Sequence, residues 1–182
     1  GGAVLDYQIN AEALLYRAEQ TSAGVAELYA LNFIGASPVK LNPSLTPGGD
    51  VRADYAVADD YVVFRADSDY DDVIELFSVD LGRNGFAPAP PVRLNPVFAP
   101  DSGANVLDFI ISGDRVIFRA DFELDEMIEL YSVSISGGDV VKPNSPLTGG
   151  GDVSPGYVVS EGRVIYIADQ TTNNTWELYS VP

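Results

Sequence analysis

The chain has 182 residues and a formal net charge of −17, from 27 acidic and 10 basic residues. Such a surface repels phosphate backbones and argues against nucleic acid as a partner, and the absence of cysteine and histidine excludes disulfides, thiolate sites and imidazole-based triads. The sequence is 46% hydrophobic, which supports a folded core, and no apolar run approaches the roughly 20 residues needed to cross a bilayer.

One segment recurs four times along the chain. Its copies are LLYRAEQTSAGVAELYAL at 14–31, VVFRADSDYDDVIELFSV at 62–79, VIFRADFELDEMIELYSV at 116–133 and VIYIADQTTNNTWELYSV at 164–181. Corresponding positions of successive copies lie 48, 54 and 48 residues apart. A period near 50 residues is typical of propeller blades or solenoid coils.

Each copy lies in a unit of short predicted strands. The apolar run and the Glu-Leu run are rich in β-branched and aromatic residues, and a polar turn separates them. An earlier strand carries an aromatic residue nine positions before the aromatic of the apolar run: Tyr7, Tyr55, Phe109 and Tyr157. A short fourth strand is expected at 38–43, 91–96 and 140–144, followed by Gly- or Pro-rich connectors. Short links make the strands antiparallel, which predicts a propeller blade.

The units resemble the propeller repeats of the TolB and PD40 (WD40-like) family. The resemblance lies in an apolar strand, an Ala-Asp pair, a polar turn and an aromatic strand, as in FRADSDYDDVIELFSVD, FRADFELDEMIELYSVSISGG and YIADQTTNNTWELYSVP. It covers almost the whole chain and implies a β-propeller. It does not imply one function, because such blades occur in binding, scaffolding and peptidase-accessory domains.

The expected fold is all-β: a β-propeller, or a segment of one, with four repeated antiparallel blades. Their predicted ranges are 1–48, 49–102, 103–149 and 150–182. The sequence stops at the third strand of the fourth unit, so fifteen strands are expected and the last blade would lack its outermost strand. An unpaired strand edge accepts another strand, so we expect protein partners at this edge, including other copies of the chain.

An arginine and a glutamate recur ten residues apart in the first three units. A hairpin that closes midway would place them opposite each other, as a structural ladder of ion pairs. The predicted pairs are Arg17 with Glu27, Arg65 with Glu75, and Arg119 with Glu129. The fourth unit has Ile167 in place of the arginine, so Glu177 is expected to find another partner. Because the feature recurs, we interpret these carboxylates as architectural and not catalytic.

The polar turns of the second and third units are acidic. Carboxylates at alternate positions resemble the start of a calcium loop, since Ca²⁺ takes about 6–8 oxygen ligands in flexible geometry. The candidate ligands are Asp67, Asp69 and Asp71 in the second unit and Asp121, Glu123 and Asp125 in the third, followed by Asp72 and Glu126. The glycine and the distant glutamate of an EF-hand are missing. The alternative is a solvated hairpin tip whose first aspartate caps the turn.

Aromatic residues also follow the Glu-Leu pairs in every unit: Tyr29, Phe77, Tyr131 and Tyr179. Because they recur, packing between blades is expected in preference to an aromatic patch for sugar binding. Trp176, the only tryptophan, has no counterpart, since the other units have Ala26, Ile74 and Ile128 there.

The motifs favour a non-enzymatic propeller module for protein binding or for self-assembly into an extracellular structure. Nothing resembles a P-loop, a nucleophile elbow or a zinc motif, and no cofactor other than calcium is expected. Three alternatives stay open: an accessory propeller of a larger enzyme such as a prolyl-oligopeptidase-type peptidase, a calcium-binding propeller, and an enzyme that uses carboxylates and a metal in the propeller channel. The acidic, cysteine-free and turn-rich composition fits an extracellular or periplasmic bacterial protein.

Overall fold

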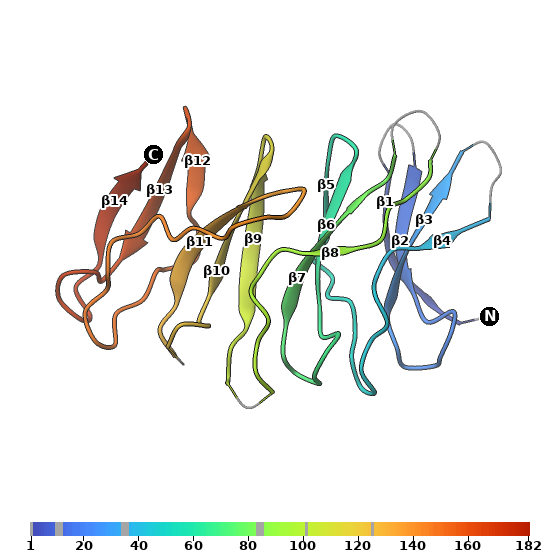
Figure 1. Cartoon of the computed structure of the whole chain (residues 1–182), viewed down its shortest axis with the longest axis horizontal. Helices are drawn as coiled ribbons and strands as arrows, with labels where there is room; N and C mark the ends of the chain where they lie inside the picture. The colour runs from blue at the N-terminus through green and yellow to red at the C-terminus, as the bar shows by residue number, and fades with distance from the viewer. Residues whose placement is uncertain (1, 10–12, 34–36, 83–85, 101, 125) are drawn as a thin grey trace. The chain divides into compact units, whose positions relative to one another are not determined.

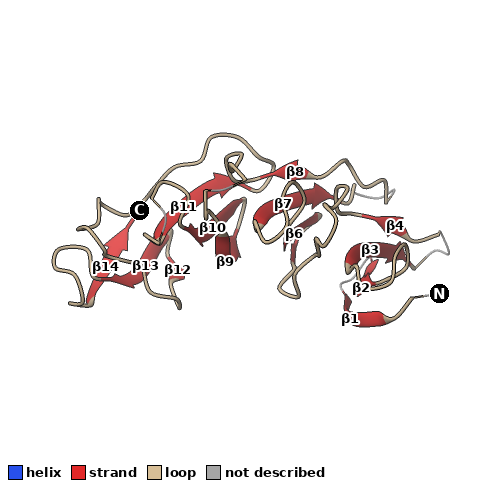
Figure 2. Cartoon of the chain, turned by 90° about the horizontal axis from the view of Figure 1, so that it is seen from below, coloured by secondary structure: helices blue, strands red, loops and turns tan. Residues whose placement is uncertain are grey.

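The fold is built from strands alone in the part of the chain that the structure describes. The computed structural model describes residues 2–9, 13–33, 37–82, 86–100, 102–124 and 126–182. These residues contain no helix (Figure 2), and so none that is long and apolar enough to cross a membrane. The strands form four antiparallel sheets, each from strands that follow one another in the chain (Figure 1). The all-β prediction is therefore confirmed.

The chain divides into two compact units, Gly1–Asn95 and Pro96–Pro182, and each contains two sheets. The first unit has sheets of four strands in the orders β1-β2-β3-β4 and β5-β6-β7-β8. The strands of its first sheet are β1 (Val4–Ile9), β2 (Ala13–Ala18), β3 (Glu27–Asn32) and β4 (Val39–Lys40). Those of its second sheet are β5 (Ala56–Ala58), β6 (Tyr61–Ala66), β7 (Glu75–Asp80) and β8 (Val92–Arg93).

The second unit has two sheets of three named strands. Their strands are β9 (Val106–Ser112), β10 (Arg115–Ala120) and β11 (Glu129–Ser134), then β12 (Val158–Ser160), β13 (Arg163–Ala168) and β14 (Glu177–Val181). The strand predicted at 140–144 is reduced to one isolated bridge, between Ser132 and Val141. The described residues therefore form fourteen strands and not the expected fifteen. Pro143 lies within this segment, and it limits the pairing there because proline cannot donate to a strand ladder. As predicted, the fourth sheet has only three strands.

A stacked aromatic pair occupies the same place in every sheet. The pairs are Tyr16 with Tyr29, Phe64 with Phe77, Phe118 with Tyr131, and Tyr166 with Tyr179, with ring centroids 5.4–5.6 Å apart. The strand register places the two residues of each pair directly opposite each other on neighbouring strands. Cross-strand aromatic pairs stabilise a sheet, so these aromatic residues have a role within their own sheet.

Within each unit, the two sheets bury apolar side chains against each other. In the first unit Leu15 and Leu28 of one sheet and Val62 and Phe64 of the other belong to the same core, and all four are fully buried. The second unit repeats this arrangement with residues of β10, β11 and β13. The alternation of strand residues gives every sheet two faces, and stacking neighbouring sheets covers them, as expected for repeated blades.

The polar turns before the four Glu-Leu strands share one backbone feature. One residue, three positions before the glutamate, has a left-handed conformation with φ between 62° and 76°: Gly24, Asp72, Glu126 and Asn174. Only glycine adopts this region without a steric cost. The turn is therefore a shared structural device, although its residues differ from unit to unit.

Candidate functional site

The recurring arginine pairs with an aspartate in the first strand, or just before it, and not with the glutamate. Arg17 Nε donates to Asp6 at 2.8 Å, Arg65 Nε to Asp54 at 2.7 Å, and Arg119 Nε to Asp108 Oδ2 at 3.0 Å. Each aspartate lies eleven residues before its arginine.

The predicted Arg–Glu ladder is wrong by one residue of register. The structure sets Ala18 opposite Glu27, and Arg17 opposite Leu28. The second and third sheets have the same register. Because side chains alternate between the faces of a strand, this shift puts each arginine and its glutamate on opposite faces of the sheet.

The arginine of the Asp–Arg pair also joins the two sheets within each compact half of the chain. Arg17 Nη1 donates to the backbone oxygen of Val51, and Arg119 Nη1 to that of Val153, both at 2.7 Å. These valines begin the next sheet in the chain. A guanidinium with a carboxylate and a carbonyl as acceptors has hydrogen-bond partners on both sides, so it serves as an anchor between sheets.

The recurring glutamate pairs instead with a cation from the fourth strand or its equivalent. Lys40 lies 2.9 Å from Glu27, Lys142 lies 3.1 Å from Glu129, and Arg93 forms an ion pair with Glu75. The three carboxylates are buried. Glu177 accepts hydrogen bonds from Thr171 and Tyr179, so the expectation that it finds another partner is confirmed. Glu27, Glu75 and Glu129 therefore tie the third strand to the outer edge of the sheet.

Tyrosine hydroxyls complete the surroundings of the glutamates. Tyr29 donates to Glu27 at 2.6 Å and Tyr131 to Glu129 at 3.1 Å. Burial raises the pKa of Glu27, but hydrogen bonds from Thr21, Tyr29 and Lys40 outweigh burial, and the pKa lies below its ordinary value. Burial, reinforced by the charge of Glu129, raises the pKa of Tyr131. The carboxylate of Glu27 is thus held charged, and the phenol of Tyr131 is held neutral.

The first acidic residue of each turn is a backbone cap. Asp67 Oδ1 accepts from the amide of Asp50 at 2.6 Å, and its Oδ2 accepts from the amide of Asp72 at 3.3 Å. Asp169 makes the matching bonds to Asp152 and Asn174. The predicted capping role is therefore confirmed for Asp67, and the same carboxylate links the turn to the segment that precedes the sheet.

The buried asparagines Asn42, Asn95 and Asn144 are structural residues that the sequence reasoning missed. Their side-chain oxygens accept hydrogen bonds from the amides of Leu28, Leu76 and Leu130, at 2.7–2.9 Å. The available signal was a recurring asparagine next to proline in LNP, LNP and KPN. A buried amide that must be bonded to backbone explains why one residue type recurs there.

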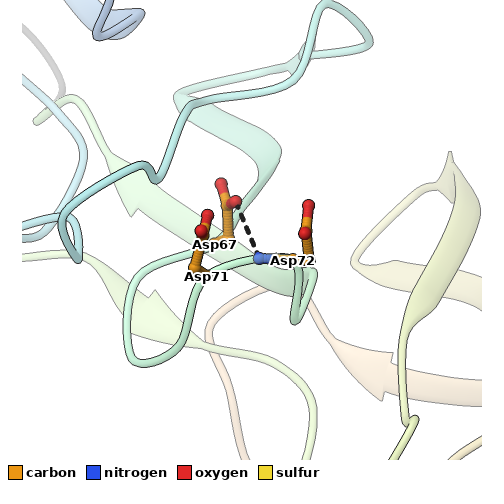
Figure 3. A group of neighbouring side chains, drawn as sticks. All are labelled: Asp67, Asp71 and Asp72. Carbon is orange, nitrogen blue, oxygen red and sulfur yellow. Dashed lines mark hydrogen bonds between the residues drawn. The ribbon is translucent and has the colours of Figure 1, made fainter.

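The structure regroups the candidate calcium ligands. Asp67, Asp71 and Asp72 have carboxylate oxygens within 4.8 Å of one another (Figure 3). Asp69 is not in this group, because it pairs with Arg93 at 2.7 Å. Both oxygens of Asp67 already accept amide hydrogens, and Arg52 lies 3.7 Å from one of them. Three carboxylates also fall short of the about six to eight oxygens of a calcium site, so the cluster alone does not make one.

The third turn offers fewer free carboxylates than predicted. Asp121 accepts from the amide of Asn105 at 2.6 Å, and Glu123 pairs with Lys142 at 2.6 Å. Asp125 lies outside the described residues. Both described candidates therefore have structural partners.

Comparison with known proteins shows the fold and goes no further. No family model and no curated sequence matches the chain. A structure from a study of two prolyl endopeptidases is 15% identical with a TM-score of 0.58, and the match covers 99% of this chain and 26% of that chain. The structure of putative TolB from Agrobacterium tumefaciens is 11% identical with a TM-score of 0.52, covering 93% of this chain and 56% of that chain. The chain spans only part of either structure, and its fold is similar to the TolB-like propeller fold.

Proposed function

We propose that the chain is a propeller module that binds a protein partner and has no catalytic activity of its own. The observation that carries the proposal is the division of the acidic residues. Those that recur at equivalent positions hold strands and sheets together, as Glu27 and Asp108 do. Those that vary between units, such as Asp71, Asp72 and Glu126, are exposed at the turns. Variable residues on a rigid repeated scaffold are suited to recognition.

The charge of the chain points to a basic partner. With a net charge of −17, long-range attraction favours lysine- and arginine-rich segments and repels acidic ones. The test is a titration of the full chain with a lysine-rich peptide, with a glutamate-rich peptide of equal length for comparison. Binding of the basic peptide should weaken as salt increases, because the contact is electrostatic.

A matched pair of variants locates the contact. The double substitution Asp71→Asn and Asp72→Asn should weaken peptide binding several-fold. Asp59→Asn changes an exposed aspartate of another turn and should have a much smaller effect. The proposal fails if the basic peptide does not bind, or if the Asp59 variant loses as much affinity as the double variant.

Self-assembly through a strand edge belongs to the same proposal. β14 lies at the edge of its sheet, whereas the equivalent strands β3 and β7 are covered by β4 and β8. Exposed edges accept further strands. Such assembly would fit an extracellular or periplasmic module, and localisation of the tagged protein by fractionation tests that part.

A second candidate is an accessory propeller of a larger enzyme. The observation in its favour is that the similar prolyl endopeptidase structure matches 99% of this chain with 26% of its own length. A hydrolase domain encoded in the same reading frame would support this candidate. Stop codons close on both sides would exclude it.

Calcium binding is a third candidate, carried by the proximity of Asp67, Asp71 and Asp72. Isothermal titration with calcium up to millimolar concentration tests it. Heat that disappears in the Asp71→Asn variant would support a site at this turn, and no heat would remove it.

A further inference from the structure

The turn between β10 and β11 presents apolar side chains to solvent. Leu124 lies at its tip and is 59% exposed, and the backbone oxygen of Leu124 accepts from the amide of Met127 at 3.1 Å. Phe122, two residues before the tip, is half-buried, as is Met127. This turn lies in the middle of the chain, far in sequence from both of its ends.

A connector beside the turn adds a second exposed apolar side chain. Val97 is 77% exposed, and its neighbour Phe98 is buried, with its ring 5.7 Å from the ring of Phe122. The carboxylate of Asp121 accepts from the amide of Asn105 at 2.6 Å and ties the connector to the start of the turn. The two segments are therefore packed together within the second compact unit. Their apolar surface is here the Leu124 patch: Val97, Phe122, Leu124 and Met127.

The repeat shows that the exposure of the Leu124 patch does not arise from the ends of the chain. The tips of the other three turns are exposed as well: Ser22, Tyr70 and Thr172. The residues that correspond to Val97, two places after the other buried asparagines, are likewise exposed: Ser44 and Pro146. Exposure is thus a property of these positions in every repeat, whichever sheets lie beside it.

The third repeat differs from the others in its apolar composition. The residues equivalent to Phe122 are polar: Gln20, Ser68 and Gln170. Each of them has a hydrogen bond to a side chain of its own hairpin, at 2.7–3.1 Å. Phe122 cannot form this bond and instead packs on Tyr131, with ring centroids 4.2 Å apart. Apolar residues at exposed positions where the scaffold elsewhere takes polar ones indicate an interaction surface.

The charge beside the patch indicates the kind of partner. Glu126, at the left-handed position of this turn, is exposed and has no ion-pair partner among the described residues. Glu123 is exposed as well and pairs with Lys142 at 2.6 Å. With a net charge of −17, the surface attracts segments that carry lysine or arginine and repels acidic ones. An apolar side chain flanked by basic residues therefore matches both the patch and its surroundings.

We propose that the Leu124 patch binds a protein segment in which a large apolar side chain is flanked by lysine or arginine residues. The proposal rests on the proposed protein-binding function and names the chemistry of the partner. Met127 suits such a contact, because its flexible side chain adapts to an incoming apolar group. The contact combines burial of apolar surface with an electrostatic attraction that salt screens.

The test is a titration of the full chain with two lysine-rich peptides of equal length and charge, one with a central leucine and one with a central serine. The leucine peptide should bind several-fold more tightly, and this preference should persist as salt increases, because only the electrostatic part is screened. The double substitution Val97→Ser and Leu124→Ser should abolish the preference and leave binding of the serine peptide unchanged. Both side chains are exposed, so the double variant should keep the wild-type unfolding midpoint. Val92→Ser changes an exposed valine of β8 and should keep the preference.

The outcomes separate this proposal from the proposed function. Equal affinity for the two peptides, or a leucine preference that survives the double substitution, overturns the proposal and leaves a module that binds basic peptides. Failure of both peptides to bind removes the proposed function as well. Light scattering of the chain without peptide is the last measurement, and we expect the 19.4 kDa monomer. Larger species that the double substitution abolishes would make a second copy the occupant and would overturn the proposal.

Discussion

Arg119 and Asp108 form an ion pair between β10 and β9, with Nε 3.0 Å from Oδ2. The same guanidinium donates to the backbone oxygen of Val153 at 2.7 Å, so one side chain fastens both a strand and the neighbouring sheet. Arg119 is 7% exposed. A charge buried to this extent is stable only while its partners remain in place.

Replacing this arginine should destabilise the protein. Arg119→Met keeps the apolar stem but leaves Asp108 and the Val153 oxygen without a donor, which should lower the free energy of unfolding by about 2–3 kcal/mol. Urea unfolding followed by circular dichroism measures the change. Arg163→Met removes an exposed arginine bonded to Ser180 and should cost about 0.5 kcal/mol or less. Equal losses for the two variants would contradict the anchoring role.

Stability should fall in acid partly through Glu27. Its pKa is lower in the folded chain than the ordinary value of 4.5, so its stabilising contribution is complete above about pH 4.5 and disappears as the pH falls through the folded value. Glu27→Gln should therefore be less stable than the wild type at neutral pH, and the difference should shrink in acid. Urea midpoints at a series of pH values measure it. Glu161→Gln alters an exposed carboxylate and is the control.

The left-handed turn position predicts opposite effects for two substitutions. Glu126 has φ 63°, and Glu126→Gly should stabilise the chain by about 0.5–1 kcal/mol, because glycine adopts this region without strain. Gly24 has φ 76°, and an added methyl group there would point into open space, so Gly24→Ala should destabilise by about 1 kcal/mol through backbone strain alone. Thermal unfolding reports both. Changes of the same sign would refute the shared turn conformation.

Replacing a buried asparagine by an apolar residue should lower the free energy of unfolding. Asn144 is 4% exposed, accepts from the amide of Leu130 at 2.8 Å and donates to the Ser145 oxygen at 2.9 Å. Asn144→Leu should cost about 1–3 kcal/mol, because it leaves buried backbone groups unbonded. Chemical unfolding measures the loss. Asn173→Leu, at an exposed turn position, is the control and should cost little.

The repeat predicted most of the secondary structure. The strands at 13–18, 61–66, 115–120 and 163–168 contain the apolar runs, and each following strand begins at the glutamate of a Glu-Leu pair. These segments follow from local properties, since β-branched and aromatic residues favour strands and polar turns separate them. The strand predicted at 140–144 did not form as a strand, since only one bridge, between Ser132 and Val141, pairs there.

Sequence spacing did not decide the ion pairs. Arg65 and Glu75 are ten residues apart in the chain, but Ala66 lies opposite Glu75 and the arginine faces the other side of the sheet. The register of a hairpin depends on how many residues its turn takes up, and one residue exchanges the two faces. The pairing of Asp69 with Arg93, which takes Asp69 out of the acidic cluster, depends likewise on the position of β8.

The sequence by itself determined the four repeated units, their strands and the absence of cysteine and histidine chemistry, because these are properties of short segments and of composition. Only the tertiary structure decided which acidic residues are anchors, which are exposed at turns, and that the equivalents of buried Tyr55 and Leu28 are uncovered at Tyr7 and Leu178. The ion-pair partners and the burial of a side chain depend on contacts between residues far apart in the chain. Repeats with nearly the same local sequence therefore differ in what packs against them.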